Sequence, residues 1–415
     1  MKLKDLSIFE FDEYSNNHPL GSYHQTSNYA LLASEEGYDY DLVGMVDDND
    51  NIVAASLIIY KKINFFNRYG YAPKGFLVDY YNPTIIKEFT KLLKKRYYNK
   101  NFSFIKINPE ISIGTIDFKQ ETIKYNENKM IEATLTGLGF KKLRDNKLFE
   151  AKFPKFNVIL PLKTATISSF DKRTRNKIRK STRNGLEFVK GDRESLDIIF
   201  NFIKNKKRKT INHYYNYYNA FSKNDSIDIF LVKMSFEESL IKAREAYEEE
   251  AYINPEIVDK LMQEPTQENL KAKIESDKNL ESIRNNIADI TRRLTEKKEE
   301  YIAGAITIRY KNRVYILISG FNQQYKSYNP NYFLHYNIIN YYKDNFDFLD
   351  LNGITGDFSD TNPYKGLNEF KRGFNPIGSE YIGEFDFIIN EGLYQNLENS
   401  GALAKEFQRV GKKAK

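Results

Sequence analysis

The chain contains 415 residues, of which 41% are hydrophobic and 15% aromatic, and it carries a formal net charge of +7. This length exceeds what one compact core normally serves, so two or three folded units are expected. A mean hydropathy of -0.62 and the lack of a long apolar run argue against a membrane-spanning helix. Acidic residues stand near the N-terminus where a signal sequence would need its apolar core, which predicts a cytoplasmic location.

Cysteine and histidine usage excludes several kinds of site. The chain has no cysteine, so disulfides, thiol nucleophiles and cysteine-based zinc sites are excluded. None of the histidines stands at a spacing typical of a metal site, and they are His18, His24, His213 and His335. We therefore expect no metal site.

Short strands alternate with helices over residues 1–155, as is typical of a mixed α/β unit. β-Branched and aromatic residues flank an acidic turn, which predicts a hairpin, and Gly137 with Gly139 closes the last helix of the unit. The predicted elements are the strands Tyr40–Val46, Ile52–Ile63 and Phe104–Ile107 and the helices Asn82–Tyr98 and Ile123–Gly137.

A second alternating unit begins near Asn157. Its basic helix is predicted to begin at an N-cap formed by Ser168 or Ser169. The order strand pair, helix, strand recurs in both halves of the chain, which suggests duplicated mixed α/β units. The predicted strands are Asn157–Leu162, Phe188–Val189, Ile227–Met234, Ala303–Tyr310, Arg313–Gly320 and Phe346–Leu351, and the predicted helices are Ser168–Gly185, Leu196–Lys209 and Tyr332–Asn345.

Residues 236–300 differ from their surroundings in having few aromatic and many charged residues. Because Pro255 and Pro265 interrupt the middle, we predict two antiparallel helices joined by a tip. The strands that enter and leave such an arm should be neighbours in a sheet. The second helix carries a stripe at heptad spacing, formed by Ile283, Ile287, Ile290 and Leu294, and the expected partners on the first helix are Leu240, Ala243 and Tyr247.

Two basic runs without acidic residues lie in neighbouring elements of the second unit, at residues 172–183 and 204–209. Such runs usually form solvated helix faces, but two of them in one unit favour a groove that binds phosphates. The candidate RNA-binding or phosphate-binding residues are Lys172, Arg173, Arg175, Arg179, Lys207 and Arg208.

Residues 350–386 place Lys371 between Phe370 and the sequence Arg372-Gly373-Phe374. A cation at a narrow apolar mouth can stabilise a developing oxyanion, because displaced water would otherwise weaken its field. Such a group suits the transfer of an activated acyl group to an amine, in which the amine itself is the nucleophile. The alternative is a surface lysine whose stem packs over the neighbouring rings.

The same region resembles the C-terminal motif of the Fem-type peptidoglycan-bridge aminoacyltransferases. Residues 21–29, 71–79 and 105–110 and the basic run from Lys172 are also similar to that family, so the resemblance covers nearly the whole chain. The matching C-terminal residues are Gly353-Ile354-Thr355-Gly356-Asp357-Phe358-Ser359, Gly366-Leu367, Phe370-Lys371, Gly373-Phe374 and Glu380-Tyr381-Ile382-Gly383-Glu384-Phe385-Asp386.

The resemblance implies an α/β (α+β) fold. It consists of two GNAT-like mixed-sheet subdomains with an inserted antiparallel coiled-coil arm. On this basis residues 1–155, completed by 378–415, are expected to form the first subdomain and residues 156–377 the second. Residues 236–300 are expected to form the arm.

The resemblance further implies a tRNA-dependent aminoacyltransferase that adds an amino acid to the stem peptide or growing bridge of a peptidoglycan precursor. The precursor would be lipid II or UDP-MurNAc-pentapeptide, with aminoacyl-tRNA as co-substrate and no cofactor. Peripheral contact with the inner membrane face and a homo- or hetero-dimer with a related transferase would fit this role. Two alternatives stay open, namely an acyl-CoA-dependent N-acetyltransferase and a non-catalytic RNA-binding module.

The family motifs also imply individual site residues. Lys371 and Phe370 match the essential lysine and its aromatic neighbour, and they are expected to be catalytic. His213 falls where many members have an arginine for the phosphates of the precursor, and a neutral histidine is a poorer phosphate anchor. The expected substrate-binding residues are Tyr217, His213, Asn108, Lys74 and Arg372.

Overall fold

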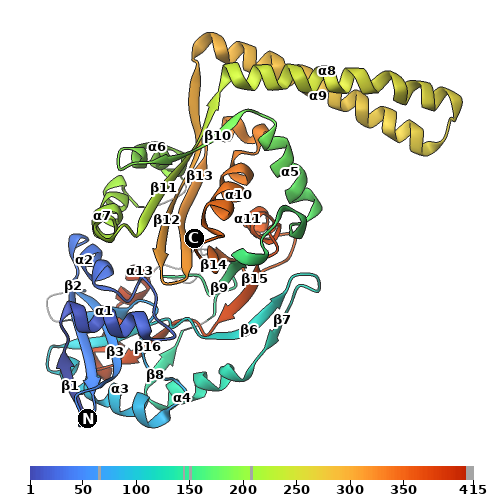
Figure 1. The fold of residues 1–415 in the computed structure, drawn as a ribbon. Helices are drawn as coiled ribbons and strands as arrows, with labels where there is room; N and C mark the ends of the chain where they lie inside the picture. Colours follow the sequence, from blue (N-terminus) through green and yellow to red (C-terminus); the bar gives the residue numbers. More distant parts are fainter. Residues whose placement is uncertain (64–66, 144, 149–151, 206–208, 408–415) are drawn as a thin grey trace.

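The computed structural model describes residues 1–63, 67–143, 145–148, 152–205 and 209–407. Two mixed β-sheets with helices on their faces form the body of the molecule, and a long helical hairpin projects from it (Figure 1). The predicted mixed α/β class with an inserted helical arm is therefore confirmed. None of the described helices combines the length and the apolar character that crossing a lipid bilayer requires.

The first sheet has the strand order β1-β2-β3-β4-β5-β16-β8. Its neighbours are antiparallel except for β4 and β5, which are parallel and joined through helix α3. The apolar stripe of α3 packs on one face, and α1, α2 and α12 pack on the other. The elements are β1 Lys2–Asp5, β2 Asp39–Val46, β3 Ile52–Lys62, β4 Arg68–Ala72, β5 Phe102–Ile107, β8 Phe140–Lys142, β16 Phe385–Ile388, α1 Ile8–Asn17, α2 Ser27–Glu35, α3 Pro83–Tyr98, α4 Ile131–Gly137, α12 Glu391–Asn399 and α13 Ala402–Glu406.

The second sheet has the order β10-β11-β12-β13-β14-β9-β15-β6-β7. Its one parallel pair, β13 with β14, is joined through α10. Helices α6 and α7 cover one face, whereas α5 and α10 cover the other. The elements are β6 Ser112–Asp117, β7 Thr122–Tyr125, β9 Phe156–Pro161, β10 Leu186–Gly191, β11 Ile227–Ser235, β12 Glu299–Tyr310, β13 Arg313–Phe321, β14 Phe348–Ile354, β15 Ile377–Tyr381, α5 Lys172–Thr182, α6 Ser195–Ile203, α7 Ile211–Phe221, α10 Pro330–Tyr342 and α11 Lys365–Arg372.

The two sheets exchange strands. β6 and β7 come from the N-terminal part of the chain but extend the second sheet, beside β15. β16, near the C-terminus, pairs with β5 and β8 in the first sheet. The C-terminal segment after α11 therefore contributes one strand to each sheet.

Several predicted elements are confirmed with small shifts of their ends. The β2–β3 hairpin closes over the acidic turn, and the side chain of Asn82 caps α3 by accepting from the Ile85 N–H. The repeated order of strand pair, helix and strand appears as β3-β4-α3-β5 in the first sheet and β12-β13-α10-β14 in the second.

Three predicted helices have wrong boundaries. The helix expected at Leu196–Lys209 ends at Ile203 in α6, and residues 206–208 of the predicted range lie outside the described residues. Residues 123–137 do not form one α-helix, because Thr122–Tyr125 is the edge strand β7 paired with β6, and a 3-10 turn at Glu127–Met130 precedes the α-helix Ile131–Gly137. β-Branched residues favour that strand. The basic helix begins at Lys172 and not at Ser168, because the Asp171 side chain accepts from the Thr174 N–H at 2.6 Å and caps it there.

The arm consists of α8 (Phe236–Gln263) and α9 (Gln267–Glu296), which pack antiparallel and extend away from the body (Figure 1). Leu240, Ala243 and Ile290 are buried in one cluster, as the heptad spacing predicted, and β11 and β12 are neighbours. The expected interruption at Pro255 is wrong, since this exposed residue lies inside α8. Packing against α9 keeps the helix continuous where the proline removes one backbone hydrogen bond.

Candidate functional site

Lys371 lies in the last turn of α11, which follows β14 through a loop. Its side chain is partly buried, and Nζ donates to the Gly353 carbonyl at the end of β14 at 2.6 Å. The buried Asn368 fixes α11 to the same loop, because its side chain donates to the Thr355 Oγ1 at 2.8 Å and accepts from the Thr355 N–H. The ammonium group of Lys371 is therefore held at a defined place beside β14.

Phe370 points into a cluster of aromatic rings. Its ring meets those of Tyr332, His335 and Phe374 edge to face, with centroids 4.9, 4.8 and 5.4 Å away. Burial lowers the pKa of His335 to about 4, and the charge of Lys371 acts in the same direction. His335 is thus neutral at pH 7, and the cluster is an apolar wall next to the cation.

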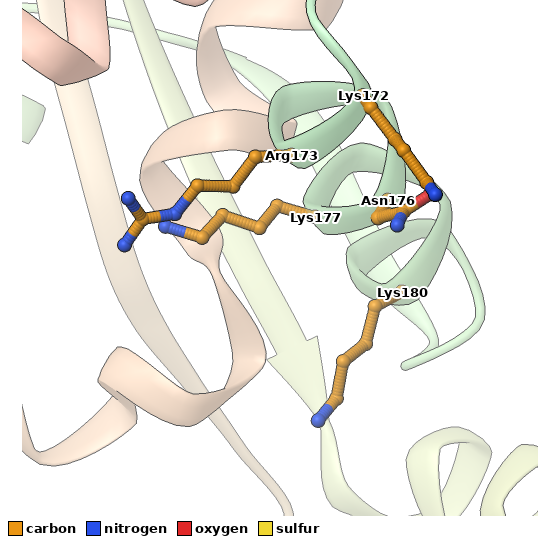
Figure 2. Close-up of a pocket in the computed structure, with 5 residues that line it drawn as sticks. All are labelled: Lys172, Arg173, Asn176, Lys177 and Lys180. Atoms are coloured by element: carbon orange, nitrogen blue, oxygen red, sulfur yellow. The ribbon is translucent and has the colours of Figure 1, made fainter. Parts of the chain in front are cut away.

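The basic helix α5 forms one side of a hollow of about 430 Å³ (Figure 2). Arg173 and Lys177 extend together to one side of the helix, whereas Lys180 reaches past its end. No acidic side chain contributes to the lining, which consists of Lys172, Arg173, Asn176, Lys177 and Lys180. A hollow with four cationic side chains is suited to binding phosphate groups.

This hollow adjoins the helix that carries Lys371. Arg173 forms an ion pair with Glu369 of α11 at 3.3 Å, and Lys177 donates to the hydroxyl of Tyr332 at 3.0 Å. Tyr332 is the ring that packs against Phe370. The two helices also meet through their backbones, since the Asp171 N–H donates to the Gly373 carbonyl at 3.0 Å. The helix that carries the phosphate-binding candidates therefore contacts the helix that carries the catalytic candidate.

The other predicted basic residues have different surroundings. Arg175 donates to the carbonyls of Ser168 and Phe170 and so holds the turn before α5. Arg179 is exposed and does not line the hollow. Lys207 and Arg208 lie outside the described residues. The sequence prediction missed Asn176, Lys177 and Lys180, although their helical spacing from Lys172 and Arg173 places them on the same side of α5.

Tyr217 and His213 lie on α7, where it packs against α2. Tyr217 is buried, its hydroxyl interacts with that of Tyr29, and burial raises its pKa. His213 pairs with Glu36. Burial alone would raise the pKa of Glu36, but His213 and Lys209 lower it below its ordinary value. His213 is thus engaged by a carboxylate, which leaves it a weak anchor for phosphate.

Lys74 and Asn108 lie in the interior, at the contact between the two sheets. Asn108 accepts from the Lys74 N–H at 3.0 Å and from the Tyr71 hydroxyl at 3.2 Å. Lys74 is only 6% exposed, and its Nζ is 3.2 Å from the carboxylate of Glu110. Arg313 of β13 contacts Glu110 at 3.1 Å. Lys74 therefore belongs to a buried ion-pair network that links the sheets.

Sequence reasoning missed the acidic and basic partners in this network, namely Glu110, Arg313 and Asp350. Arg313 pairs with both carboxylates, one from each sheet region. No local spacing could have indicated them, because the three residues are far apart along the chain.

Arg372 has different partners from those of Lys371. Its guanidinium pairs with Glu121 at 3.1 Å and lies over the ring of Phe118, both in the turn between β6 and β7. Its contacts thus tie α11 to the edge of the second sheet.

The structure groups the candidates in three places. Lys371 and Phe370 adjoin the α5 hollow on one face of the second sheet, whereas Tyr217 and His213 lie with α7 on its other face. Lys74 and Asn108 lie between the sheets. Within the part of the chain that the structure describes, no three histidine or acidic side chains are arranged to hold a metal ion.

Comparison with known proteins identifies the family. The sequence model of the FemAB family matches residues 6–399. The chain belongs to the FemAB family. A lipid II:glycine glycyltransferase from Staphylococcus epidermidis is 23% identical over the full length of both chains. One from Staphylococcus aureus is 24% identical over 98% of this chain and 97% of its own.

A crystal structure of FemX shares the fold of this FemAB-family chain. The TM-score is 0.73 at 21% sequence identity, and the match covers 96% of this chain and 100% of that one. The predicted resemblance to Fem-type proteins is thus confirmed. The prediction that the chain is an enzyme of the acyltransferase class is confirmed as well, since the curated relatives are named as transferases.

Proposed function

We propose that this FemAB-family chain transfers an amino acid from aminoacyl-tRNA to an amino group on the peptide of lipid II. The observation that carries the proposal is the contact between helix α5, which lines the basic hollow, and the helix that holds Lys371. The name of the Staphylococcus relatives, lipid II:glycine glycyltransferase, supports the acceptor and makes glycine the first donor to test.

In the proposed reaction the amine of the acceptor attacks the ester carbonyl that links the amino acid to the tRNA. A C–N bond forms, the C–O bond to the ribose breaks, and the proton lost by the amine ends on the ribose oxygen. The ammonium group of Lys371 stabilises the oxyanion of the tetrahedral intermediate. The α5 cations bind the phosphates of the acceptor end of the tRNA and bring the ester to Lys371.

Replacing Lys371 by Met tests the chemical role. Lys371→Met removes the charge but keeps most of the stem, so we expect transfer from glycyl-tRNA to lipid II to fall by about a thousandfold, as for loss of an oxyanion donor. Lys365→Met is the matched control, because Lys365 lies in the same helix with a side chain that is 46% exposed and paired with Asp360. Wild-type turnover in Lys371→Met would remove Lys371 from the mechanism.

The acceptor in this proposal is anchored in a membrane, and α3 offers a surface for peripheral contact. Lysines at helical spacing line a second hollow of about 500 Å³ together with Tyr98, and they are Lys87, Lys91, Lys94 and Lys95. Among the described residues, Lys87, Lys94 and Lys95 have no acidic partner within 4 Å, whereas Arg96 of the same helix pairs with Asp5 and Asp41. Lys91 pairs with Glu88 at 3.6 Å. A stripe in which the other three lysines have no such partner in the described part of the chain, next to an aromatic residue, suits anionic lipid headgroups.

Two triple variants test both surfaces and serve as controls for each other. The α5 variant Lys172→Gln/Lys177→Gln/Lys180→Gln should weaken tRNA binding and reduce its salt dependence by about one phosphate contact per lysine. The α3 variant Lys87→Gln/Lys94→Gln/Lys95→Gln should weaken binding to phosphatidylglycerol vesicles by about a hundredfold, at about 1 kcal/mol per lysine. Equal effects of both variants on both ligands would show only a general loss of positive charge.

The same assays decide between the open alternatives. Stabilisation by acetyl-CoA in a thermal-shift measurement would favour an acyl-CoA-dependent N-acetyltransferase. Salt-sensitive tRNA binding without any product from lipid II or UDP-MurNAc-pentapeptide would favour a non-catalytic RNA-binding module. Product from the nucleotide-linked precursor alone would contradict the lipid-linked acceptor.

A further inference from the structure

Strand β14 contains one residue more than the stretch of β9 that it faces. Asp350 pairs with Ile159, whereas Gly353 pairs with Asn157, so two residues of β14 lie opposite one residue of β9. Asn352, inside this interruption, has a φ of 68°, in the left-handed region. The feature is a β-bulge, and a bulge bends its strand and redirects the groups that follow it.

Buried side chains hold the bulge in place. The Asp350 carboxylate accepts from the Asn352 N–H at 2.7 Å, and it is only 4% exposed. The Asn157 amide donates to both oxygens of Asp350 at 3.0 and 3.1 Å, and Arg313 forms an ion pair with the same carboxylate. Asp350 is therefore fixed from two sides and in turn fixes the backbone of Asn352.

The group that the bulge redirects is the Gly353 carbonyl. It accepts from Lys371 Nζ at 2.6 Å, while the Gly353 N–H donates to the side chain of Asn352 at 2.7 Å. A Cβ atom at position 353 would lie 2.1 Å from Pro154 Cγ, so only glycine fits there. A continuous chain of contacts thus leads from Arg313 through Asp350 and the bulge to Lys371.

We propose that the β14 bulge sets the position of Lys371, with Asp350 and Asn352 as positioning residues. A lysine ammonium on a flexible stem has many rotamers, and a carbonyl fixed at hydrogen-bond distance selects one of them. This inference rests on the proposed role of Lys371 in transfer. It predicts that the backbone conformation at Asn352 controls the rate of the chemical step.

Two substitutions at one position test the backbone role. Valine is β-branched and disfavours a left-handed φ, whereas glycine adopts it freely. We expect Asn352→Val to lower kcat for transfer from glycyl-tRNA to lipid II by about a hundredfold, the size of effect of a misplacement of about 1 Å, with KM unchanged. Asn352→Gly should keep kcat close to that of the wild type.

A matched control separates positioning from general destabilisation. Asn101 also has a left-handed φ, of 60°, and lies exposed in the turn before β5, in the first sheet. Asn101→Val should lower the melting temperature about as much as Asn352→Val but leave kcat intact. If Asn352→Val does not fold, Asp350→Asn replaces it, since this variant keeps an acceptor for the Asn352 N–H but loses the ion pair with Arg313. We expect it to lower kcat at unchanged KM.

The outcomes distinguish this inference from the proposed function. An inactive Lys371→Met together with a fully active Asn352→Val would overturn the positioning role and leave the catalytic role intact. An Asn352→Gly variant as slow as Asn352→Val would also overturn it, because the side chain and not the backbone would then matter. An active Lys371→Met would instead contradict the proposed function itself.

Discussion

The buried ion-pair network between the sheets leads to a quantitative prediction for Glu110. Burial alone would raise the pKa of this carboxyl group, but Arg313 and Lys74 lower it from the ordinary value of 4.5 to about 2. This difference corresponds to about 3 kcal/mol of folding free energy at pH 7. Because the folded-state pKa is the lower one, the stabilisation is present above pH 4.5 and is lost as the pH falls through 2.

The perturbation is Glu110→Gln, measured by urea unfolding followed by circular dichroism. We expect the variant to be less stable by about 3 kcal/mol at pH 7 and by only about 1 kcal/mol at pH 3, where the wild type has already lost most of the contribution. Glu296→Gln in the arm is the control. Its pair with Arg292 is exposed, so the expected loss is below about 0.5 kcal/mol at both pH values. A gap between wild type and Glu110→Gln that stays constant from pH 7 to pH 3 would refute the reasoning.

Three further predictions concern other parts of the chain. The free energy of unfolding of Asn108→Asp, measured in urea, should lie within about 1 kcal/mol of the wild-type value, because a carboxylate also accepts from the Lys74 N–H and the Tyr71 hydroxyl. Asn108→Leu leaves both donors unpaired and should lower this free energy by about 2 kcal/mol or more. Pro255→Ala should make the arm more resistant to limited proteolysis, since an exposed proline inside α8 costs up to about 3 kcal/mol relative to alanine. In the wild type the pKa of His335 is about 4 when folded and 6.5 when unfolded, so the free energy of unfolding should fall as the pH drops from 6.5 to 4. His335→Gln should make this fall smaller. An unchanged pH dependence of the free energy of urea unfolding would contradict the prediction.

The fold was predictable wherever the pattern is local. The β2–β3 hairpin, α3 with its Asn82 cap, and the heptad stripe of α9 follow from spacings of a few residues, and all three are present. The prediction was wrong where long-range pairing competes with a helical pattern. Thr122–Tyr125 is a strand because it pairs with β6 at the edge of the sheet, and α8 continues through Pro255 because it packs against α9.

The candidate site was predictable only in part. The basic run and Lys371 were identified from the sequence, because charge runs and short motifs are local features of the sequence. Their contact was not visible, since it depends on Glu369 and Tyr332, which lie about 150 residues or more from α5 and reach it through the packing of α10 and α11. The assignment of Lys74 and Asn108 to substrate stays a prediction, and both are held in the buried network.

The sequence by itself determined the class of fold, the arm and the residue types of a cation-assisted transfer, because these depend on periodicity, composition and short motifs. Only the tertiary structure decided which groups meet. Asn157 of β9 and Arg313 of β13 hold the Asp350 carboxylate beside the bulge, and Glu110 meets Arg313 between the two sheets. These contacts depend on strand register and on the pairing of buried charges, and a short stretch of sequence specifies neither of them.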